Sequence, residues 1–265
     1  MNDLLLICPV CGLPLSVCAN TYKCANNHSF DIAKEGYVNL LRNQRSGDSI
    51  GDSKQSARSR RDFLNKNYYR LLQNSLTELF ADKQGSVLDI CCGEGYYTSA
   101  LGENAALHVY GFDISKEMIR LASKRGNATY FVANLATIPV ADESFDYAVH
   151  LFAPFQEKEF SRILKKGGKL YTVIPGKNHL YGLKQVLYDS PYYNDENLPE
   201  TSCLQLCGKK KVSGKILLSC PEDIMAVFQM TPYYYRTSER DKKKLACLNM
   251  LETEVSFVIA EYIKI

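Results

Sequence analysis

The pattern of apolar and polar positions divides the chain into two parts. From residue 85 onward, short apolar runs alternate with segments whose apolar residues recur at helical spacing. Strands are predicted over residues 87–90, 109–114, 129–133, 147–152 and 169–174. Helices are predicted over residues 96–101 and after Ser115, whose hydroxyl suits a helix N-cap. Strands that alternate with helices indicate an α/β fold with a mostly parallel sheet covered on both faces.

The segments on either side follow other patterns. Residues 1–41 are rich in cysteine and turn-forming residues, and the polar, glycine-bearing stretch that follows is typical of a loop. Apolar residues at helical spacing predict one or two helices over residues 53–80, and a final helix and strand over residues 233–265 that closes the sheet edge. Residues 180–230 give no readable pattern. The expected division is a small module, a linker with helices and a large α/β domain, at residues 1–41, 42–84 and 85–265.

The composition is that of a globular protein. Hydrophobic residues make up 46% of the 265 residues and charged residues 23%, so the chain can bury a substantial core. Its longest apolar runs are far shorter than the ~20 residues that cross a bilayer, and its N-terminus lacks the basic and apolar stretches of a secretion signal. We therefore expect a cytoplasmic protein with no membrane partner.

Positive charge is concentrated in the first quarter of the chain. Residues 1–70 contain 10 Lys and Arg against 6 Asp and Glu, whereas the remainder contains 22 against 23. An excess confined to one end favours an anionic partner such as nucleic acid, although solvated faces of lysine and arginine also produce it.

Three of the ten cysteines form, with a histidine, a pattern typical of a zinc site. Cys8 and Cys11 are separated by two residues, and Cys24 and His28 by three. Zn²⁺ takes four tetrahedral nitrogen or sulfur ligands, which two such pairs can supply, and in a reducing compartment paired cysteines are more often ligands than disulfides. Four protein ligands leave no open position, so the predicted role is structural. The alternative is a set of unligated cysteines, with Cys18 as a fifth that fits neither pair.

A glycine-containing turn joins the first predicted strand of the α/β domain to the following helix. Asp89 lies near the end of that strand, and Gly93 and Gly95 lie in the turn, where absent side chains let the backbone approach a cofactor. Asp113, at the end of the second strand, can accept hydrogen bonds from both ribose hydroxyls of a nucleoside. Asn134, after the third strand, can contact the adenine or act as an ordinary turn residue.

The turn also distinguishes between two nucleoside cofactors. A dinucleotide site usually carries a third glycine so that the pyrophosphate can rest on backbone amides, and this chain lacks a glycine at that offset. A carboxylate at the end of the first strand would repel a pyrophosphate but suits a sulfonium compound with a charged amino-acid tail. The sequence therefore favours S-adenosylmethionine over NAD.

These segments together resemble the bacterial 23S rRNA (guanine-N1)-methyltransferases of the RlmA family, which includes the tylosin-resistance enzymes. The similarity covers essentially the whole chain. The string Ala-Lys-Glu-Gly-Tyr-Val-Asn-Leu-Leu at residues 33–41 separates this family from other methyltransferases. The other matching segments lie at residues 8–11, 24–31, 51–53, 88–90, 92–97, 175–176, 179–180 and 229–232.

The resemblance implies a zinc module that helps to hold rRNA, followed by a Rossmann-like S-adenosylmethionine-dependent methyltransferase domain. It implies methylation of guanine N1 in a hairpin of 23S rRNA, and it allows a homodimer whose two zinc modules flank an RNA cleft. Under it, the Cys and His residues of the N-terminal pattern become the zinc ligands. The positions that fall where the family contacts S-adenosylmethionine are Tyr69, Gly93, Glu94 and His179.

Several residues near the turn depart from the family or leave a role open. Cys91 stands where most members carry the first glycine of the turn, so a left-handed backbone there would be strained. Phe152 and Phe155 follow the fourth strand on the acceptor side, where either ring can stack on the target base or belong to the core. His150 and His179 are candidate general bases, but a lone histidine is more often structural, so no catalytic residue is assigned.

Two other functions stay open on the sequence. One is a small-molecule methyltransferase with the same cofactor domain. The other is a non-catalytic, zinc-bearing RNA-binding protein with a decayed cofactor site, for which Cys91 is the only hint. Cofactor binding separates the second alternative from the enzymes, and methyl transfer to rRNA separates the first from an RNA methyltransferase.

Overall fold

The computed structural model describes residues 5–41 and 54–265. The loop expected after residue 41 and the family motif at residues 51–53 therefore lie outside the described residues. The main sheet consists of β4 (Val38–Asn39), β5 (Gly85–Ile90), β6 (Leu107–Asp113), β7 (Thr129–Val132), β8 (Phe145–Leu151), β9 (Leu164–Pro175), β10 (Leu204–Leu218) and β11 (Leu251–Lys264).

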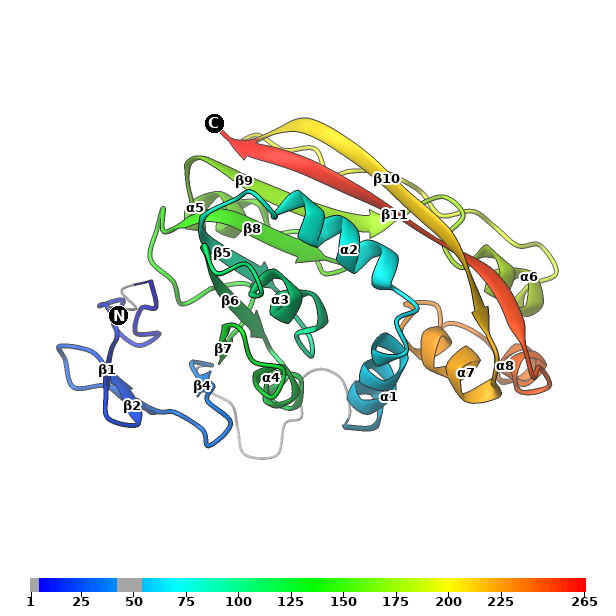
Figure 1. Cartoon of the computed structure of the whole chain (residues 1–265), viewed down its shortest axis with the longest axis horizontal. Helices are drawn as coiled ribbons and strands as arrows, with labels where there is room; N and C mark the ends of the chain where they lie inside the picture. The colour runs from blue at the N-terminus through cyan, green and yellow to red at the C-terminus, as the bar shows by residue number, and fades with distance from the viewer. Residues whose placement is uncertain (1–4, 42–53) are drawn as a thin grey trace.

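These eight strands lie in the order β10-β11-β9-β8-β5-β6-β7-β4 (Figure 1). The pairs from β9 to β4 are all parallel, whereas β11 runs antiparallel to both β9 and β10. This is a Rossmann-like sheet with one reversed strand near an edge, and the predicted α/β class is confirmed.

The predicted helices are present. Two helices form between residues 54 and 80, where one or two were predicted. The Ser115 hydroxyl accepts a hydrogen bond from the Met118 amide at 3.3 Å, as an N-cap does. The helices are α1 (Lys54–Asn65), α2 (Arg70–Leu79), α3 (Tyr96–Leu101), α4 (Lys116–Ser123), α5 (Glu157–Ile163), α6 (Tyr181–Leu187), α7 (Pro221–Gln229) and α8 (Glu239–Ala246). Within the described ranges, none of them is long and apolar enough to cross a membrane.

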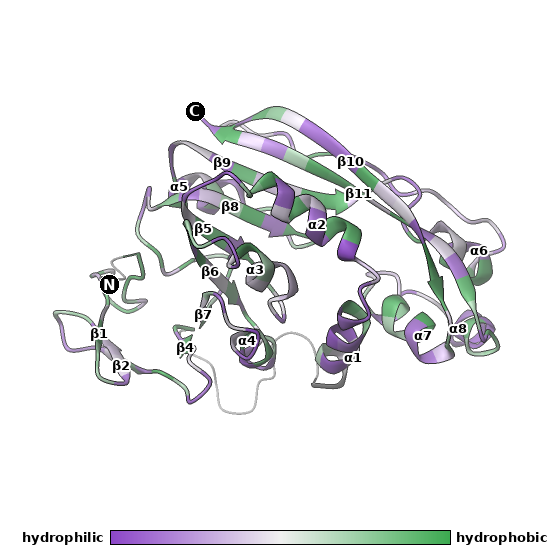
Figure 2. Cartoon of the chain, in the orientation of Figure 1, coloured by the Kyte–Doolittle hydropathy of each residue, from purple (hydrophilic) through white to green (hydrophobic). Residues whose placement is uncertain are grey.

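The core lies on both faces of the sheet, because successive side chains of a strand point to opposite faces. On β5, Val87 belongs to the cluster that contains residues of α2 and α3, whereas Leu88 and Ile90 belong to the cluster that contains residues of α5. The central strands are accordingly mostly hydrophobic in Figure 2. Asp89 lies between Leu88 and Ile90 and therefore points toward α3, the face that carries the cofactor turn.

The far edge of the sheet differs from the prediction. The last strand, β11, does not close the edge but lies between β9 and β10, and the long strand β10 forms the edge. The sequence missed β10 because most of its side chains are exposed, so it shows no regular apolar alternation. Its run Lys209 to Lys211 protects an exposed edge from pairing with other chains.

The N-terminal module has a small sheet of its own and is attached to the main one. Its strands β1 (Ser16–Cys18), β2 (Thr21–Lys23) and β3 (Ser29–Asp31) pair antiparallel, and β4 then pairs parallel with β7. The Ile7 amide donates to the Pro139 carbonyl at 3.0 Å, and the Ala141 amide donates to the Leu5 carbonyl at 2.9 Å. Residues of the module also share a buried cluster with β7 and the segment after it, so the module packs against the sheet edge.

Candidate functional site

The four predicted zinc ligands meet in one cluster whose ligand atoms all lie within 4.8 Å of one another. His28 Nδ1 lies 3.5 Å from Cys8 Sγ and 3.4 Å from Cys24 Sγ, and the sulfurs of Cys11 and Cys24 are 3.7 Å apart. Zinc bonds of ~2.3 Å to sulfur and ~2.0 Å to nitrogen place tetrahedral ligands roughly 3.5–3.8 Å apart. The donor set therefore fits a tetrahedral zinc ion held through His28 Nδ1, and the exposed Cys18 takes no part.

Two tight turns present these ligands. In the first, the Gly12 amide donates to the Cys8 carbonyl at 2.8 Å, and Gly12 has a φ of +75°. In the second, the Asn27 amide donates to the Cys24 carbonyl at 2.9 Å, and Asn27 has a φ of +60°. Glycine and asparagine tolerate this left-handed backbone best, so the residues between the ligands are suited to the turns they form.

The cofactor turn lies between β5 and α3, and its glycines serve different purposes. An added Cβ at Gly93 would meet nothing within 4 Å, so this side of the turn is open to a ligand. An added Cβ at Gly95 would lie 2.8 Å from the Ala122 side chain, so the missing side chain there serves packing against α4. Cys91 has a φ of +57°, which is the strained left-handed conformation expected at this departure from the family.

Asp113 ties the turn to the start of α4. Its Oδ2 accepts a hydrogen bond from the Gly93 amide at 3.0 Å, and its Oδ1 accepts one from the Ser115 amide at 2.9 Å. A carboxylate oxygen can accept more than one hydrogen bond. Because Asp113 also lines the cavity in front of the turn, it can accept hydrogen bonds from a ligand there.

Asp89 is a buried carboxylate with one unused oxygen. Its side chain is 1% exposed, and its Oδ2 accepts a hydrogen bond from the Thr98 hydroxyl at 2.6 Å. Its Oδ1 has no hydrogen-bond partner among the described residues. Burial raises the pKa of Asp89 to about 7 against the opposing effect of Thr98. An unpartnered buried acceptor that lines a cavity indicates a ligand with a donor or a positive charge.

Glu94 is held by an ion pair. Its Oε2 lies 2.6 Å from Arg125 Nε, and Arg125 also donates to Asn65 Oδ1 at 2.7 Å, so the pair connects the turn to the end of α1. Burial raises the pKa of Glu94, and Arg125 opposes this effect. Its Oε1 has no partner among the described residues, and that oxygen is the part of Glu94 that can reach a ligand.

A cavity of about 290 Å³ opens in front of the turn. Four of the predicted cofactor residues line it, namely Asp89, Gly93, Glu94 and Asp113. Sequence reasoning missed Arg60 and Leu64, which α1 contributes from outside the α/β units, and Tyr97, whose buried hydroxyl has no partner among the described residues. Other lining residues are Cys91, Cys92, Tyr96, Ile114, Ser115, Met118, Leu151, Phe152, Ala153 and Pro154.

The other predicted cofactor residues do not line this cavity. Gly95 belongs to the turn but faces Ala122 of α4, away from the cavity. Asn134 is exposed, and its Oδ1 accepts a hydrogen bond from the Ala136 amide at 3.0 Å, which is the geometry of an ordinary turn residue. The Tyr69 hydroxyl lies 3.3 Å from His179 Nε2. Both rings pack against Phe257, which separates them from Phe152 at the edge of the cavity.

The hydrogen bonds of His179 define its tautomer. The Ser256 amide donates to Nδ1 at 3.2 Å, so the proton of the neutral ring is on Nε2 and is donated to the Tyr69 hydroxyl oxygen. Burial lowers the pKa of His179 to about 3, so the ring is neutral at pH 7. Both nitrogens are engaged, and this arrangement leaves no lone pair for a general base.

His150 does not line the cavity in front of the turn. It lies on β8 beside Leu151, which lines the cavity, and therefore points to the opposite face of the sheet. Its ring packs against Phe155 and Phe160, with centroids 5.9 and 5.0 Å away, and burial lowers its pKa to about 4. The geometry excludes both histidines as bases in this arrangement.

The structure also separates the two candidate stacking rings. Phe152 lines the cavity, is 47% exposed and has a φ of +55°. Phe155 instead packs against Phe160 and Tyr262 on the other face of the sheet. Phe152 is therefore the ring that can meet a second substrate beside the cofactor.

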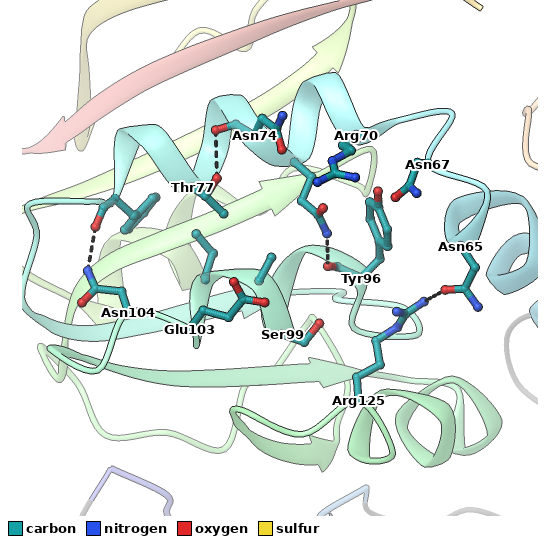
Figure 3. A pocket seen from close by; sticks show the side chains of 14 residues that line it. Asn65, Asn67, Arg70, Asn74, Thr77, Tyr96, Ser99, Glu103, Asn104 and Arg125 are labelled. Carbon is teal, nitrogen blue, oxygen red and sulfur yellow. Dashed lines mark hydrogen bonds between the residues drawn. The ribbon is translucent and has the colours of Figure 1, made fainter.

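A larger polar groove of about 590 Å³ lies between α2 and α3 (Figure 3). Tyr96 forms a wall common to this groove and to the cofactor cavity. The Gln73 side-chain amide donates to the Tyr96 carbonyl at 2.9 Å. Arg125 donates to Asn65 Oδ1 across one end of the groove. None of the predicted cofactor residues lines the groove, so it is separate from the predicted site.

Both parts of the chain are similar to known protein families. Residues 6–46 match the zinc-ribbon family described as "RlmA, N-terminal", and residues 87–168 match a methyltransferase domain. The 23S rRNA (guanine(748)-N(1))-methyltransferase of Streptomyces fradiae is 33% identical over 190 residues, which cover 69% of this chain and 67% of that protein. The chain belongs to the RlmA family of 23S rRNA (guanine-N1)-methyltransferases.

Other members of the RlmA family agree. A Bacillus subtilis protein provisionally named as a 23S rRNA (guanine-N1)-methyltransferase is 34% identical over 199 residues, with 69% of each chain covered. A Micromonospora griseorubida protein with the same provisional name is 31% identical, over 67% of this chain and 68% of its own. The chain is thus an S-adenosylmethionine-dependent methyltransferase of the RlmA family with a structural zinc ribbon.

Proposed function

We propose that this enzyme methylates N1 of a guanine in a hairpin of 23S rRNA. The observation that carries the proposal is the exposed Phe152 ring on the rim of the cofactor cavity, in a chain whose zinc ribbon and relatives are those of the RlmA family. An exposed aromatic ring beside a methyl donor suits a flat, unpaired base.

We assign the cofactor contacts to the residues that line the cavity. Asp113 would accept hydrogen bonds from the ribose hydroxyls, and the unused oxygen of Asp89 would face the ammonium of the amino-acid tail. The open side of Gly93 leaves room for the ligand close to the backbone. When bound, S-adenosylmethionine supplies a methyl group on a sulfonium, and the protein's main task is to align it with the acceptor nitrogen.

Tyr69 and His179 take an indirect part in this proposal. Both pack on Phe257, with ring centroids 5.2 and 4.8 Å away, and Phe257 in turn lies 5.8 Å from Phe152. They would therefore position the stacking ring rather than touch the cofactor. The guanine N1 proton must leave as the new bond forms, and with both histidine rings excluded we assign no residue to accept it.

The zinc module would dock the RNA. Lys23 and Lys34 are exposed on it, and the module packs beside β7, the strand that precedes Asn134. Deleting the module is a poor test, because the deletion would uncover the apolar residues that it shares with the main core. Replacing Lys23 and Lys34 with alanine should instead raise the KM for RNA and leave cofactor affinity unchanged. The control is the exposed Lys166 at the amino end of β9, away from the cofactor turn, which follows the carboxyl end of β5.

Further parts of the proposal concern assembly and domains. We propose the division at residues 1–41, 42–84 and 85–265, and a homodimer in which two zinc modules flank the RNA. Sedimentation velocity with and without a 23S rRNA hairpin tests the dimer. A monomeric complex at saturating RNA would overturn it.

The decisive experiment is transfer of a labelled methyl group from S-adenosylmethionine to 23S rRNA, with the modified nucleotide mapped by mass spectrometry. We expect one guanine methylated at N1. Phe152→Ala should lower transfer at least about tenfold and should lower stability less than Phe155→Ala, because the Phe152 side chain is 47% exposed. Phe155→Ala should mainly lower stability, because its ring is packed. Labelling of small molecules but not of RNA would favour the small-molecule alternative.

A further inference from the structure

Exposed aromatic side chains are few among the described residues, and two of them are neighbours in the chain. Among the described residues, four Phe or Tyr side chains are strongly exposed: Phe152 (47%), Tyr192 (52%), Tyr193 (50%) and Tyr235 (77%). Phe152 lies on the cavity rim, and the first two tyrosines lie in the segment between α6 and β10 (Figure 1). Large apolar rings are normally buried, so a local group of exposed ones indicates a binding surface.

The segment that carries the two tyrosines is irregular but well anchored. Residues 188–203 form no helix or strand, and irregular segments of this length usually have a function. The Asn194 side-chain amide donates to the carbonyls of Gly176 and His179, each at 3.0 Å. Lys184 Nζ in turn donates to Asn194 Oδ1 at 2.6 Å. The segment is thus fixed to the loop that carries His179.

Lys184 also fixes the ring of Tyr192. Its side chain is 1% exposed, and a buried ammonium needs hydrogen bonds or aromatic faces to replace water. Its Nζ donates to the Tyr192 carbonyl at 3.2 Å and lies 4.1 Å from the centroid of the Tyr192 ring. One face of this ring therefore rests on the buried cation, the Tyr188 ring lies 5.7 Å away, and the side chain is 52% exposed.

Tyr193 is held in a different way. Its ring stacks on that of Tyr181, with centroids 4.5 Å apart and planes within 10°. The exposed Lys177 places its Nζ 5.0 Å from the Tyr193 centroid. We call Tyr181, Tyr192 and Tyr193 the tyrosine rim. It combines two exposed rings, those of Tyr192 and Tyr193, with the exposed Lys177, and aromatic rings beside positive charge bind single-stranded nucleic acid.

The tyrosine rim is connected to the cavity through packed rings. Phe152 contacts Phe257, and Phe257 contacts His179 at 4.8 Å. Asn194 holds the His179 carbonyl. These contacts tie the segment that carries the tyrosine rim to the wall of the cavity that Phe152 forms.

From this arrangement we propose that the tyrosine rim stacks unpaired nucleobases that flank the target guanine in the RNA, with Lys177 on the phosphodiester backbone. The inference rests on the proposed function and adds the site of the neighbouring nucleotides. A guanine whose N1 is accessible lies in an unpaired region or is splayed from its helix, so its neighbours also offer free faces. Stacking depends little on base identity, so the rim would supply affinity and orientation and not sequence choice.

The test uses the full-length, zinc-loaded enzyme and a hairpin of 23S rRNA. The double variant Tyr192→Ala/Tyr193→Ala should raise the KM for RNA at least about tenfold and change kcat and the Kd for S-adenosylmethionine by less than about twofold, because the rim lies outside the cofactor cavity. The matched variant Tyr192→Phe/Tyr193→Phe keeps both rings and should remain within about threefold of wild type. Leu206→Ala, near the start of β10, is the control for an exposed apolar side chain.

The outcomes are distinguishable. If the wild-type enzyme transfers no methyl group to rRNA, the proposed function fails and the inference fails with it. If the wild type methylates rRNA and the alanine pair behaves like it, only the inference is overturned, and a protein partner becomes the better occupant. Equal losses in the alanine and phenylalanine pairs would overturn stacking. Photocrosslinking of 4-thiouridine placed beside the target guanine provides a second readout: crosslinks to Tyr192 or Tyr193 support the inference, and crosslinks confined to other segments overturn it.

Discussion

Two residues that line the cofactor cavity, and one beside His179, have a left-handed backbone conformation. Cys91 and Phe152 line the cavity with φ of +57° and +55°, and Leu180, next to His179, has a φ of +56°. Each such residue costs on the order of 1–3 kcal/mol and persists only where its surroundings hold it. The glycine turn and the loop after β8 are thus held in shapes that their own residues do not prefer.

A substitution pair tests this strain. Cys91→Gly should raise the free energy of unfolding by about 1 kcal/mol, because glycine adopts the left-handed conformation without penalty. Cys92→Gly should lower it by about 1–2 kcal/mol, because Cys92 has no such conformation and packs against the cluster around Tyr130. Urea denaturation measures both. Changes of the same sign would contradict the strain.

The buried carboxyl of Asp89 predicts how cofactor affinity depends on pH. Burial raises its pKa from 3.8 to about 7, so below pH 7 the ligand-free protein holds this group mostly neutral. A cationic tail binds the ionised form, and the proton must leave. The Kd for S-adenosylmethionine should therefore rise up to about tenfold per pH unit below 7. Calorimetric titration measures this effect, and Asp89→Asn should bind more weakly and show a flat profile.

Among the elements, α1 covers the cofactor cavity and is fixed from two sides. Arg125 reaches Asn65 at its end. The Asp223 carboxylate of α7, 5% exposed, accepts hydrogen bonds from Lys66 Nζ at 2.6 Å and from the Tyr68 hydroxyl at 2.7 Å, just after α1. The two anchors place Arg60 and its neighbours over the glycine turn.

Removing the second anchor should weaken both stability and cofactor binding. Asp223→Ala leaves the Tyr68 hydroxyl without its acceptor and should cost about 1–3 kcal/mol of unfolding free energy. The Kd for S-adenosylmethionine should rise several-fold, because α1 lines the cavity. Thermal melts and cofactor titration check this result, with the exposed Asp82→Ala as control. Unchanged affinity in a destabilised Asp223 variant would show that α1 is held by other contacts.

The sequence predicted the elements that have a local signal. The Ser115 cap, the helix at residues 96–101 and the central strands follow from patterns within a few residues. It could not predict β4, which is two residues long and depends on pairing with the distant strand β7. Neither could it predict Arg60 in the cavity, because that position depends on how α1 packs on distant elements.

The site, too, was predictable only where its residues lie close to the turn in the sequence. Asp89, Gly93, Glu94 and Asp113 are adjacent to the turn in sequence or one strand away, and they line one cavity. Tyr69 and His179 were named by family resemblance alone, and they contact each other outside it. The choice between Phe152 and Phe155 depends on the face to which the loop directs each ring, and no pattern of residue types contains that information.

For the whole molecule, the metal should support more than the module that binds it. Residues of the module share a buried cluster with β7 and the segment after it, and β4 extends the main sheet. Removal of zinc with a chelator should lower the melting temperature by about 5 °C or more. Differential scanning calorimetry measures the melting temperature, and metal analysis of the same sample measures the zinc content. Cys24→Ser should reproduce the effect and Cys18→Ser should not, because only Cys24 belongs to the ligand cluster.

The pairing of β4 with β7 has a consequence for biosynthesis. Val38 pairs with Phe131, so the partner strand is made about 90 residues later, a delay on the order of 5–20 s at ribosomal speed. During that interval the nascent metal-binding segment can already be closed on its ion while its apolar side still faces solvent. Zinc binding can thus keep the module folded until β7 has been synthesised and covers its apolar side.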